Sequence, residues 1–284
     1  MKKAQQVVIF LLRVKIHFVA AFSKRKAAQM AFDIFCTPFR KPRPVAPPIF
    51  KKSTEFSIQV NGFKLIGHKW NENAKSKVLI VHGFESRAYN FDRYISPLMK
   101  KGYAVFAMDA KAHGQSEGKT ITAPETADMI KVLEATVGKF DGFICHSFGG
   151  ISVALHQEKN NNPNARLVLI APATETSTAL QKFCDFFRLG DAIREEMDNI
   201  IFKAAGVRST HYSIKRIIPM VNNPVLWIHD EDDDITPLAD VIPLIDTNPH
   251  NVEFMITQGL GHRKIYKENK VQKKVIDFFE DLSI

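Results

Sequence analysis

One stretch decides the fold of this chain: Gly142-Phe143-Ile144-Cys145-His146-Ser147-Phe148-Gly149-Gly150. Its first half is an apolar run typical of a buried strand, and the two glycines after the serine favour a tight turn into a helix. A serine at such a junction projects its hydroxyl above the edge of the sheet, while small neighbours keep the turn free of collisions. The usual pattern is G-x-S-x-G, and here Cys145 replaces the first glycine. The stretch predicts a nucleophile at Ser147, although a helix N-cap in a closely packed turn is the structural alternative.

A second apolar run, at residues 77–81, ends at His82-Gly83-Phe84. Continuous aliphatic runs of this kind are typical of parallel strands that are buried on both faces. Because the glycine lets the chain turn sharply, we expect the N–H groups of Phe84 and Phe148 to point into the same space. Two such donors would stabilise a developing oxyanion. An ordinary loop between a strand and a helix is the alternative.

A third strand-like run, at residues 224–229, leads into an acidic loop. A carboxylate at the carboxyl end of this strand would accept the Nδ1–H of a histidine, fix its tautomer and stabilise the imidazolium. The residue types leave four candidates open, namely Asp230, Asp232, Asp233 and Asp234. A solvated acidic loop is the alternative. A calcium loop is disfavoured because the glycine and spaced ligands of an EF-hand are absent.

The fourth element is Gly259-Leu260-Gly261-His262, directly after the strand-like run at residues 252–256. Glycines on both sides of Leu260 suit an exposed turning loop, and loops at the carboxyl ends of strands carry many catalytic side chains. We therefore predict that His262 is a general base. Its place in the chain order Ser, Asp, His supports this interpretation over that of a surface histidine.

Strand and helix patterns alternate along most of the chain. Residues 54–60 and 63–70 flank Asn61-Gly62, which predicts a β-hairpin. The pattern then predicts strands at about 77–82, 103–108, 142–146, 166–171, 224–229 and 252–257, and helices near 88–101, 124–138, 148–160, 238–246 and 263–282. This alternation indicates the α/β class, with a mostly parallel sheet that has helices on both faces. It stops at residues 172–220, where helix-like segments at 178–187 and 191–205 predict a small helical insertion.

The ordered motifs HGF at residues 82–84, CHSFGG at 145–150, HDEDDDITP at 229–237 and GLGH at 259–262 resemble those of the α/β-hydrolases over residues 54–284. In that family the catalytic acid lies four residues before the proline, which implies Asp233, with Asp232 and Asp234 as alternatives. The loop 109–118 resembles one that is mainly architectural in the family, so no catalytic role is expected for its polar residues, Asp109, His113 and Ser116. The insertion would form a lid over an apolar acyl or aromatic pocket.

The resemblance implies a serine hydrolase that cleaves a small-molecule carboxylic ester or thioester through an acyl-enzyme, without a cofactor or a metal ion. Its triad would be Ser147, Asp233 and His262, and the Phe84 and Phe148 amides would form the oxyanion hole. Alternatives on the same fold are a carbon–carbon hydrolase, a peptidase or a perhydrolase. A protein that has kept the fold as a non-catalytic binding or scaffold module is the alternative from another class.

The positive charge of the chain lies almost entirely in its first part. The net charge is +9 over 284 residues. Residues 1–52 carry 12 Lys and Arg against Asp33 alone, whereas residues 53–284 carry 27 against 29 acidic residues. We therefore divide the chain into a basic helical arm with a proline-rich linker, 1–52, and a hydrolase domain, 53–284, with a lid at about 172–220. The near-neutral domain offers no basic surface for a nucleic acid.

The basic arm contains an apolar run at residues 7–12 that is similar to part of a signal peptide. Charged residues interrupt it too early for a spanning helix, and no small-residue cleavage site follows. The spacing instead predicts a helix with five apolar residues on one face, namely Val7, Leu11, Val14, Phe18 and Phe22. Such a helix would cover the hydrolase domain or lie on an anionic membrane surface. A stiff linker would follow, with prolines at 38, 42, 44, 47 and 48.

The cysteines indicate the redox compartment. Cys36, Cys145 and Cys184 are too few and too scattered for a disulfide framework or a zinc site. A reducing, cytoplasmic compartment is therefore expected, with membrane association through the arm as a further possibility.

Overall fold

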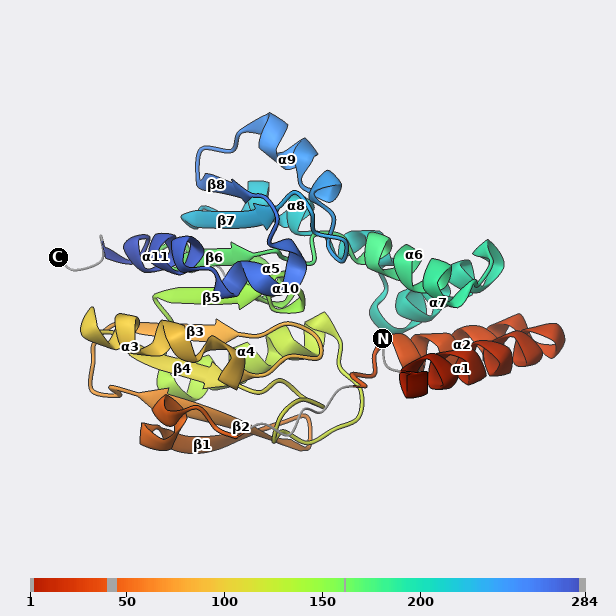
Figure 1. Cartoon of the computed structure of the whole chain (residues 1–284), viewed down its shortest axis with the longest axis horizontal. Coiled ribbons are helices and arrows are strands. Elements are labelled where there is room, and N and C mark those ends of the chain that lie inside the picture. Colours follow the sequence, from red (N-terminus) through yellow and green to blue (C-terminus); the bar gives the residue numbers. More distant parts are fainter. Residues whose placement is uncertain (1–2, 40–44, 161, 281–284) are drawn as a thin grey trace. The chain divides into compact units, whose positions relative to one another are not determined.

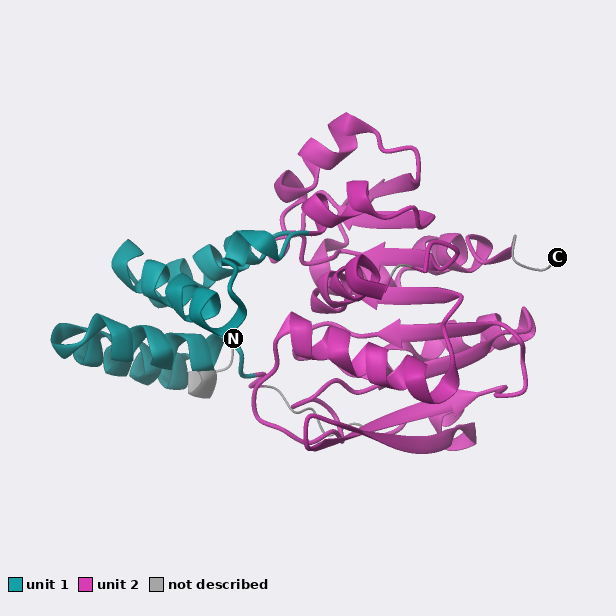
Figure 2. Ribbon diagram, turned by 180° about the vertical axis from the view of Figure 1, so that it is seen from behind, with its two compact units in different colours: residues 1–37, 175–213 teal, residues 38–174, 214–284 magenta. Residues whose placement is uncertain are grey.

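A computed structural model describes residues 3–39, 45–160 and 162–280 of the chain. Pro42 and Pro44 of the expected linker lie outside these ranges. The chain divides into two compact units, which are coloured separately in Figure 2. Unit 1 comprises residues 1–37 and 175–213, and unit 2 comprises residues 38–174 and 214–284. Each unit has its own hydrophobic cluster.

Within the described residues, unit 2 contains an eight-stranded sheet of order β1-β2-β4-β3-β5-β6-β7-β8 (Figure 1). Strand β2 is antiparallel to both of its neighbours, and the other neighbouring strands are parallel. The predicted α/β architecture with a mostly parallel sheet is therefore confirmed. The strands are β1 (Thr54–Val60), β2 (Phe63–Trp70), β3 (Lys77–Val81), β4 (Ala104–Met108), β5 (Gly142–His146), β6 (Arg166–Ile170), β7 (Val225–Asp230) and β8 (Val252–Thr257).

Helices cover both faces of this sheet. The helices α3 (Asp92–Lys100) and α11 (Asn269–Asp277) lie on one face, and α4 (Ala123–Val137) and α5 (Phe148–Asn160) lie on the other (Figures 1 and 2). Every residue of β4 and β5 is buried, as expected for central strands that are covered on both sides. Because β3, β5, β6, β7 and β8 are parallel, their carboxyl ends meet at one edge of the sheet, where loops can bring polar side chains together.

The antiparallel strands β1 and β2 are joined by Asn61 and Gly62, both at positive φ, +50° and +82°. A two-residue turn of type I′ needs positive φ at both positions, and asparagine and glycine tolerate it best. In the register of this pair, Val60 lies opposite Phe63.

Three predicted helices are shorter or more broken than their apolar spacing indicated. The predicted helix 263–282 consists of α10 (Gly261–Lys264), a 3₁₀ turn at Ile265–Lys267 and α11, because Glu268 is extended with φ −75° and ψ 136°. The predicted helix 88–101 begins as a 3₁₀ turn before α3, and the one at 238–246 becomes a 3₁₀ turn followed by α9 (Ile242–Thr247). One extended residue ends a helix without disturbing the spacing of apolar residues, so periodicity does not detect it.

Unit 1 consists of α1 (Lys3–Phe22), α2 (Lys24–Phe35), α6 (Thr176–Phe187) and α7 (Asp191–Ala205), which form one packed helical unit (Figure 2). Ser23 separates the first two helices. Its side chain accepts the Lys26 N–H and so caps α2. The sequence analysis predicted α1 and both insertion helices but not α2 as a separate helix. The predicted division separated the arm from a hydrolase domain that included the insertion, whereas residues of both the arm and the insertion belong to this unit.

The core of unit 1 explains why these helices assemble. Its fully buried residues come from the arm and from the insertion, and they include Ile16, Ala28, Leu180, Cys184 and Met197. The side of α2 that faces this core carries only alanines at its most buried positions, which lets α7 approach closely. The ends of the insertion are joined by an antiparallel bridge between Glu175 and Ser213. Burial of apolar surface therefore connects two segments that are far apart in the sequence.

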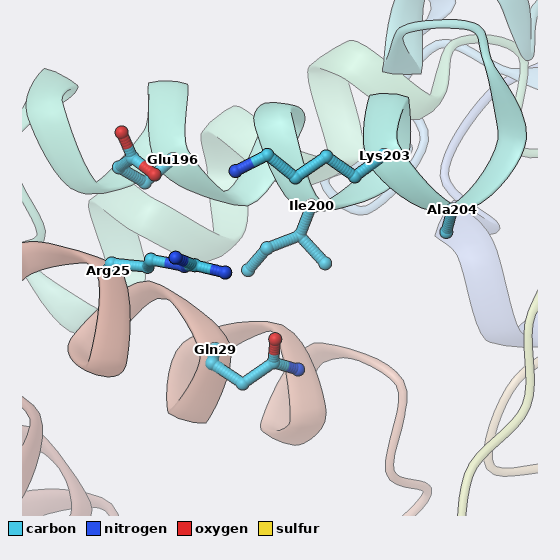
Figure 3. Close-up of a pocket in the computed structure, with 6 residues that line it drawn as sticks. All are labelled: Arg25, Gln29, Glu196, Ile200, Lys203 and Ala204. Atoms are coloured by element: carbon cyan, nitrogen blue, oxygen red, sulfur yellow. The ribbon is translucent and has the colours of Figure 1, made fainter.

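A hollow of about 280 Å³ lies between α2 and α7 (Figure 3). Its polar lining includes Arg25 and Gln29 from α2, and Glu196 and Lys203 from α7. The hollow belongs to unit 1, whereas the predicted catalytic residues belong to unit 2. None of the helices described in either unit has the length and apolar character needed to span a membrane.

Candidate active site

The turn after β5 holds Ser147 in an uncommon backbone conformation. Its φ of +52° lies in the left-handed region, where residues other than glycine are strained. Three backbone hydrogen bonds hold this turn. The Ser147 N–H donates to the Ile170 carbonyl at 3.1 Å, and the Ser147 carbonyl accepts from Gly150 at 2.8 Å and from Ala173 at 3.0 Å. This is the strand-to-helix turn that the sequence predicted for a nucleophile.

His262 connects Ser147 to an acidic residue. Its Nε2 lies 2.9 Å from the Ser147 Oγ, and its Nδ1 lies 2.8 Å from the Asp233 Oδ2. All three residues are at least nine-tenths buried. Because an ionised carboxylate only accepts hydrogen bonds, Nδ1 carries the proton and Nε2 is free to accept the serine hydroxyl. The structure therefore brings together the three side chains that the sequence analysis singled out.

Asp233 is held as an anion by several donors. Its Oδ1 accepts the N–H groups of Ile235 and Thr236 at 2.9 and 2.8 Å, and its Oδ2 accepts the Thr236 hydroxyl at 2.9 Å. Burial alone raises the pKa of this carboxyl. The hydrogen bond and the electrostatic effect of the His262 ring, together with the N–H groups of Thr236 and Ile235, outweigh burial and lower the pKa of Asp233 below its usual value. Thr236 also lies 3.1 Å from the His262 Nδ1, a contact that the sequence analysis missed.

The neighbouring aspartates have different partners. Asp232 accepts the Gly259 N–H at 2.9 Å, and Asp234 is exposed. Asp230 is fully buried and accepts the N–H groups of Gly261 and Leu260 at 2.8 and 3.2 Å. Burial raises its pKa, but hydrogen bonds from Thr257 and from these amides lower the pKa overall. Asp230 thus fastens the loop that carries His262.

His146 supports the same loop from the other side. Its Nε2–H donates to the His262 carbonyl at 2.9 Å, and its ring centroid lies 4.7 Å from that of His262. Burial, together with the nearby His262, lowers the pKa of His146 to about 3. The imidazole is therefore neutral near pH 7, which allows two histidine rings to pack together without charge repulsion. No sequence pattern indicated a role for His146.

The predicted oxyanion-hole residues are neighbours. The rings of Phe84 and Phe148 lie edge to face with centroids 5.8 Å apart. A Cβ built on Gly83 would lie 3.0 Å from the Ser147 Cβ, so the turn after β3 runs directly beside the serine. Phe148 is the first residue of α5, and the first N–H groups of a helix have no partner within the helix. Both residues thus lie beside the Ser147 turn, where the sequence predicted the oxyanion hole.

The loop at 109–118 supports this turn. Glu85 has a positive φ of +55°, and its N–H donates to the His113 Nε2 at 3.0 Å. Asp109 is buried and accepts the N–H groups of Ala88 and Gln115. The Ser116 hydroxyl donates to the Asp109 carbonyl at 2.6 Å. These contacts link the loop to the residues that follow Phe84 and are consistent with the architectural role that the resemblance implied.

Comparison with known proteins finds similar hydrolases. A family described as serine aminopeptidase, S33, matches residues 72–190. A monoacylglycerol lipase of Mycolicibacterium smegmatis is 21% identical over 259 residues, which cover 77% of this chain and 92% of the relative. The structure of the Pyrococcus furiosus esterase Pf2001 is similar with a TM-score of 0.63 at 21% identity, over 85% of this chain and 97% of the esterase. The structure of a membrane phospholipase A, described as a bacterial virulence factor, is similar with a TM-score of 0.61 at 16% identity, over 99% of both chains.

Proposed function

We propose that this chain, which has the fold of the α/β-hydrolases, hydrolyses carboxylic esters with Ser147 as nucleophile, His262 as general base and Asp233 as its acidic partner. One observation carries the proposal. The two hydrogen bonds of His262, 2.9 Å to the serine hydroxyl and 2.8 Å to the carboxylate, orient the imidazole so that Nε2 can take the serine proton while Asp233 holds Nδ1.

The proposed reaction begins with attack of the Ser147 oxygen on the ester carbonyl carbon. His262 takes the hydroxyl proton at Nε2, and Asp233 stabilises the imidazolium through its hydrogen bond to Nδ1. The tetrahedral intermediate collapses when His262 returns the proton to the leaving alkoxide, which departs as the alcohol. Water then attacks the acyl-enzyme, again with His262 as base, and releases the carboxylic acid and the free Ser147 hydroxyl.

The Phe84 and Phe148 N–H groups are the proposed donors to the oxyanion. Their proximity to Ser147 supports this role, as does the fixed backbone on both sides of it. Donors that are fixed before the reaction need no reorganisation when charge develops on the carbonyl oxygen. The loss of one such donor typically costs about 10²–10³ in kcat.

Acyl esters of glycerol are the substrate class that we propose first. The names of a similar curated protein, monoacylglycerol lipase, and of a similar structure, membrane phospholipase A, support this choice. Thioesters are the second choice, because the same acyl-enzyme forms from a thiol ester. A hydrolysis panel of monoacylglycerols, p-nitrophenyl esters of graded chain length and acyl-CoAs would separate the two.

A peptidase is the second candidate function, favoured by the description of the matching family, serine aminopeptidase. Its proposed chemistry uses the same three side chains but transfers the acyl group from an amide. Aminoacyl p-nitroanilides provide the test. Turnover of these amides at a kcat/KM above that of every ester in the panel would replace the ester proposal.

A fluorophosphonate probe tests whether Ser147 is the nucleophile. We expect the wild-type chain to be labelled and Ser147→Ala to be unlabelled. Ser96→Ala is the matched control because Ser96 is exposed on α3, outside the proposed site, so its labelling should equal that of the wild type. Undiminished labelling of Ser147→Ala would refute the assignment. A folded wild type that takes up no label would favour the non-catalytic alternative.

A further inference from the structure

We propose that one face of α1 binds the surface of an anionic lipid bilayer, with the helix lying in the plane of the interface. This outer face consists of Val7, Leu11, Val14, Phe18 and Phe22. The sequence predicted these residues to share one side of a helix without deciding what they contact. The inference does not depend on the proposed ester hydrolysis, because every residue that carries it lies in unit 1 and outside the proposed catalytic site.

The first observation is the exposure of the outer face. Its five side chains are between 49% and 79% exposed, the highest value being that of Phe22. The opposite side of the same helix is buried in the core of unit 1, where Ile16 is fully buried and Leu12 and Val19 pack around it. The helix therefore has two apolar sides. The inner side stabilises the unit by packing in its core, whereas the fold of unit 1 does not require the outer side to be apolar.

The second observation is that the outer face is continuous. Its members are spaced by three or four residues, so they form one stripe along the helix. From Val7 to Phe22 the stripe extends over about 22 Å at 1.5 Å per residue. The rings of Phe18 and Phe22 are in contact, with centroids 5.2 Å apart. Exposed apolar surfaces of this size mark sites of interaction with proteins or membranes.

The third observation is the charge around the outer face, which favours a lipid surface as the partner. Lys15 is exposed on the same helix, and the exposed triplet Lys24-Arg25-Lys26 follows Ser23 at the start of α2. Asp33 is the one acidic residue in the first 52 positions of the sequence. Basic side chains next to exposed phenylalanines and aliphatics match an interface in which acyl chains meet anionic headgroups.

The geometry also decides between lying in a membrane and crossing it. No helix among the described residues is long and apolar enough to span a bilayer. The inner side of α1 is occupied by the core of unit 1, so only the outer face is free to enter lipid. A helix that lies in the plane of the interface buries one apolar side to the depth of the headgroup boundary, and the outer face of α1 is such a side.

Cosedimentation of the full chain with lipid vesicles tests the proposal. We expect binding to vesicles of phosphatidylglycerol and phosphatidylcholine, and much weaker binding to phosphatidylcholine alone. Phe18→Ser should lower the partition coefficient on the anionic vesicles about tenfold or more, because a large apolar side chain no longer enters the interface. Phe202→Ser is the matched control, since Phe202 is 47% exposed on α7, away from the outer face, and it should bind like the wild type.

A charge variant tests the electrostatic part separately. Lys24→Glu combined with Lys26→Glu should weaken binding to the anionic vesicles by about tenfold or more, because each basic residue near the surface contributes ~1 kcal/mol of attraction. The binding that remains should depend less on salt. Acidic residues are favourable in the first turn of a helix, so α2 should still form. Lys131→Glu combined with Lys270→Glu, at exposed positions of α4 and α11, changes the net charge by the same amount and is the control.

Turnover of a water-soluble ester should be the same in all these variants and the wild type, which separates this inference from the proposed function. Equal vesicle binding by Phe18→Ser and the wild type would overturn the proposal. So would a wild-type chain that stays in the supernatant with anionic vesicles. A concentration-dependent dimer in sedimentation velocity that Phe18→Ser abolishes, without vesicle binding, would assign the outer face to a second copy of this chain instead.

Discussion

Replacement of Gly149 by alanine tests how the fold sets the geometry of the proposed site. Gly149 is the second residue of α5 and follows Phe148, whose N–H is a proposed oxyanion donor. A Cβ built on Gly149 would lie 2.3 Å from the Val81 carbonyl oxygen and 2.9 Å from that of His82. Both obstacles are backbone atoms at the end of the central strand β3, so no side-chain rotation relieves the clash.

The size of the required shift follows from these distances. Ordinary van der Waals contact of a Cβ begins at 3.4 Å, so the first turn of α5 must move away from β3 by about 1 Å. Ser147 and Phe148 move with it, while His262 stays on its own loop. A misplacement of about 1 Å costs on the order of 10² in rate. The overpacked contact should also destabilise the folded state by about 1–3 kcal/mol.

The assay measures kcat/KM on a soluble p-nitrophenyl ester, normalised to the fraction of sites that a fluorophosphonate titrates, and the urea midpoint of unfolding. Gly190→Ala is the control. Its added Cβ meets no atom within 4 Å, and its φ of −74° suits alanine. We expect wild-type turnover and a stability change below about 1 kcal/mol for this variant. Wild-type kcat/KM and an unchanged midpoint for Gly149→Ala would show that α5 tolerates the methyl group, and the reasoning from close approach would be wrong.

Three further predictions concern the support of His262. Asp233→Asn should reduce kcat by about 10³–10⁴, because an amide no longer fixes the productive tautomer; steady-state kinetics with an unchanged circular-dichroism spectrum would measure it, and a reduction below tenfold would contradict the role. Asp230→Ala should lower stability by about 2–4 kcal/mol, since the half-buried amides of Leu260 and Gly261 lose their acceptor. It should also lower kcat more than it changes KM, and equal urea midpoints for variant and wild type would argue against it. His146 has a pKa of about 3 in the folded state against about 6.5 when unfolded, so the unfolded chain binds the extra proton and acid destabilises the fold between these values. The contribution of neutral His146 to the free energy of unfolding is complete above pH 6.5, and about 2 kcal/mol of it is lost on going to pH 5. Urea titrations at pH 7 and pH 5 should therefore show that His146→Gln loses about 2 kcal/mol less than the wild type, and equal losses would refute the assignment.

The sequence by itself determined the class of fold and the main positions of its elements. Apolar runs and their alternation with amphipathic segments reflect local burial, and burial on both faces requires long aliphatic stretches such as residues 77–81. The serine turn could be predicted because a strained backbone at Ser147 needs small residues beside it, and these residues are its neighbours in the sequence. Helix ends were less visible, since an extended residue such as Glu268 leaves the apolar spacing intact.

Only the tertiary structure decided which distant groups meet. Residue types left four aspartates open, and the contact between Asp233 and His262 depends on the turn after β7 and the loop after β8, which lie side by side through strand pairing. The same holds for Asp230 and His146, whose partners are backbone groups that no side-chain pattern specifies. The assembly of the arm with the insertion into unit 1 is likewise a long-range event. Apolar spacing along α1 marks both of its sides as apolar, and only packing against the other helices determines which side is buried.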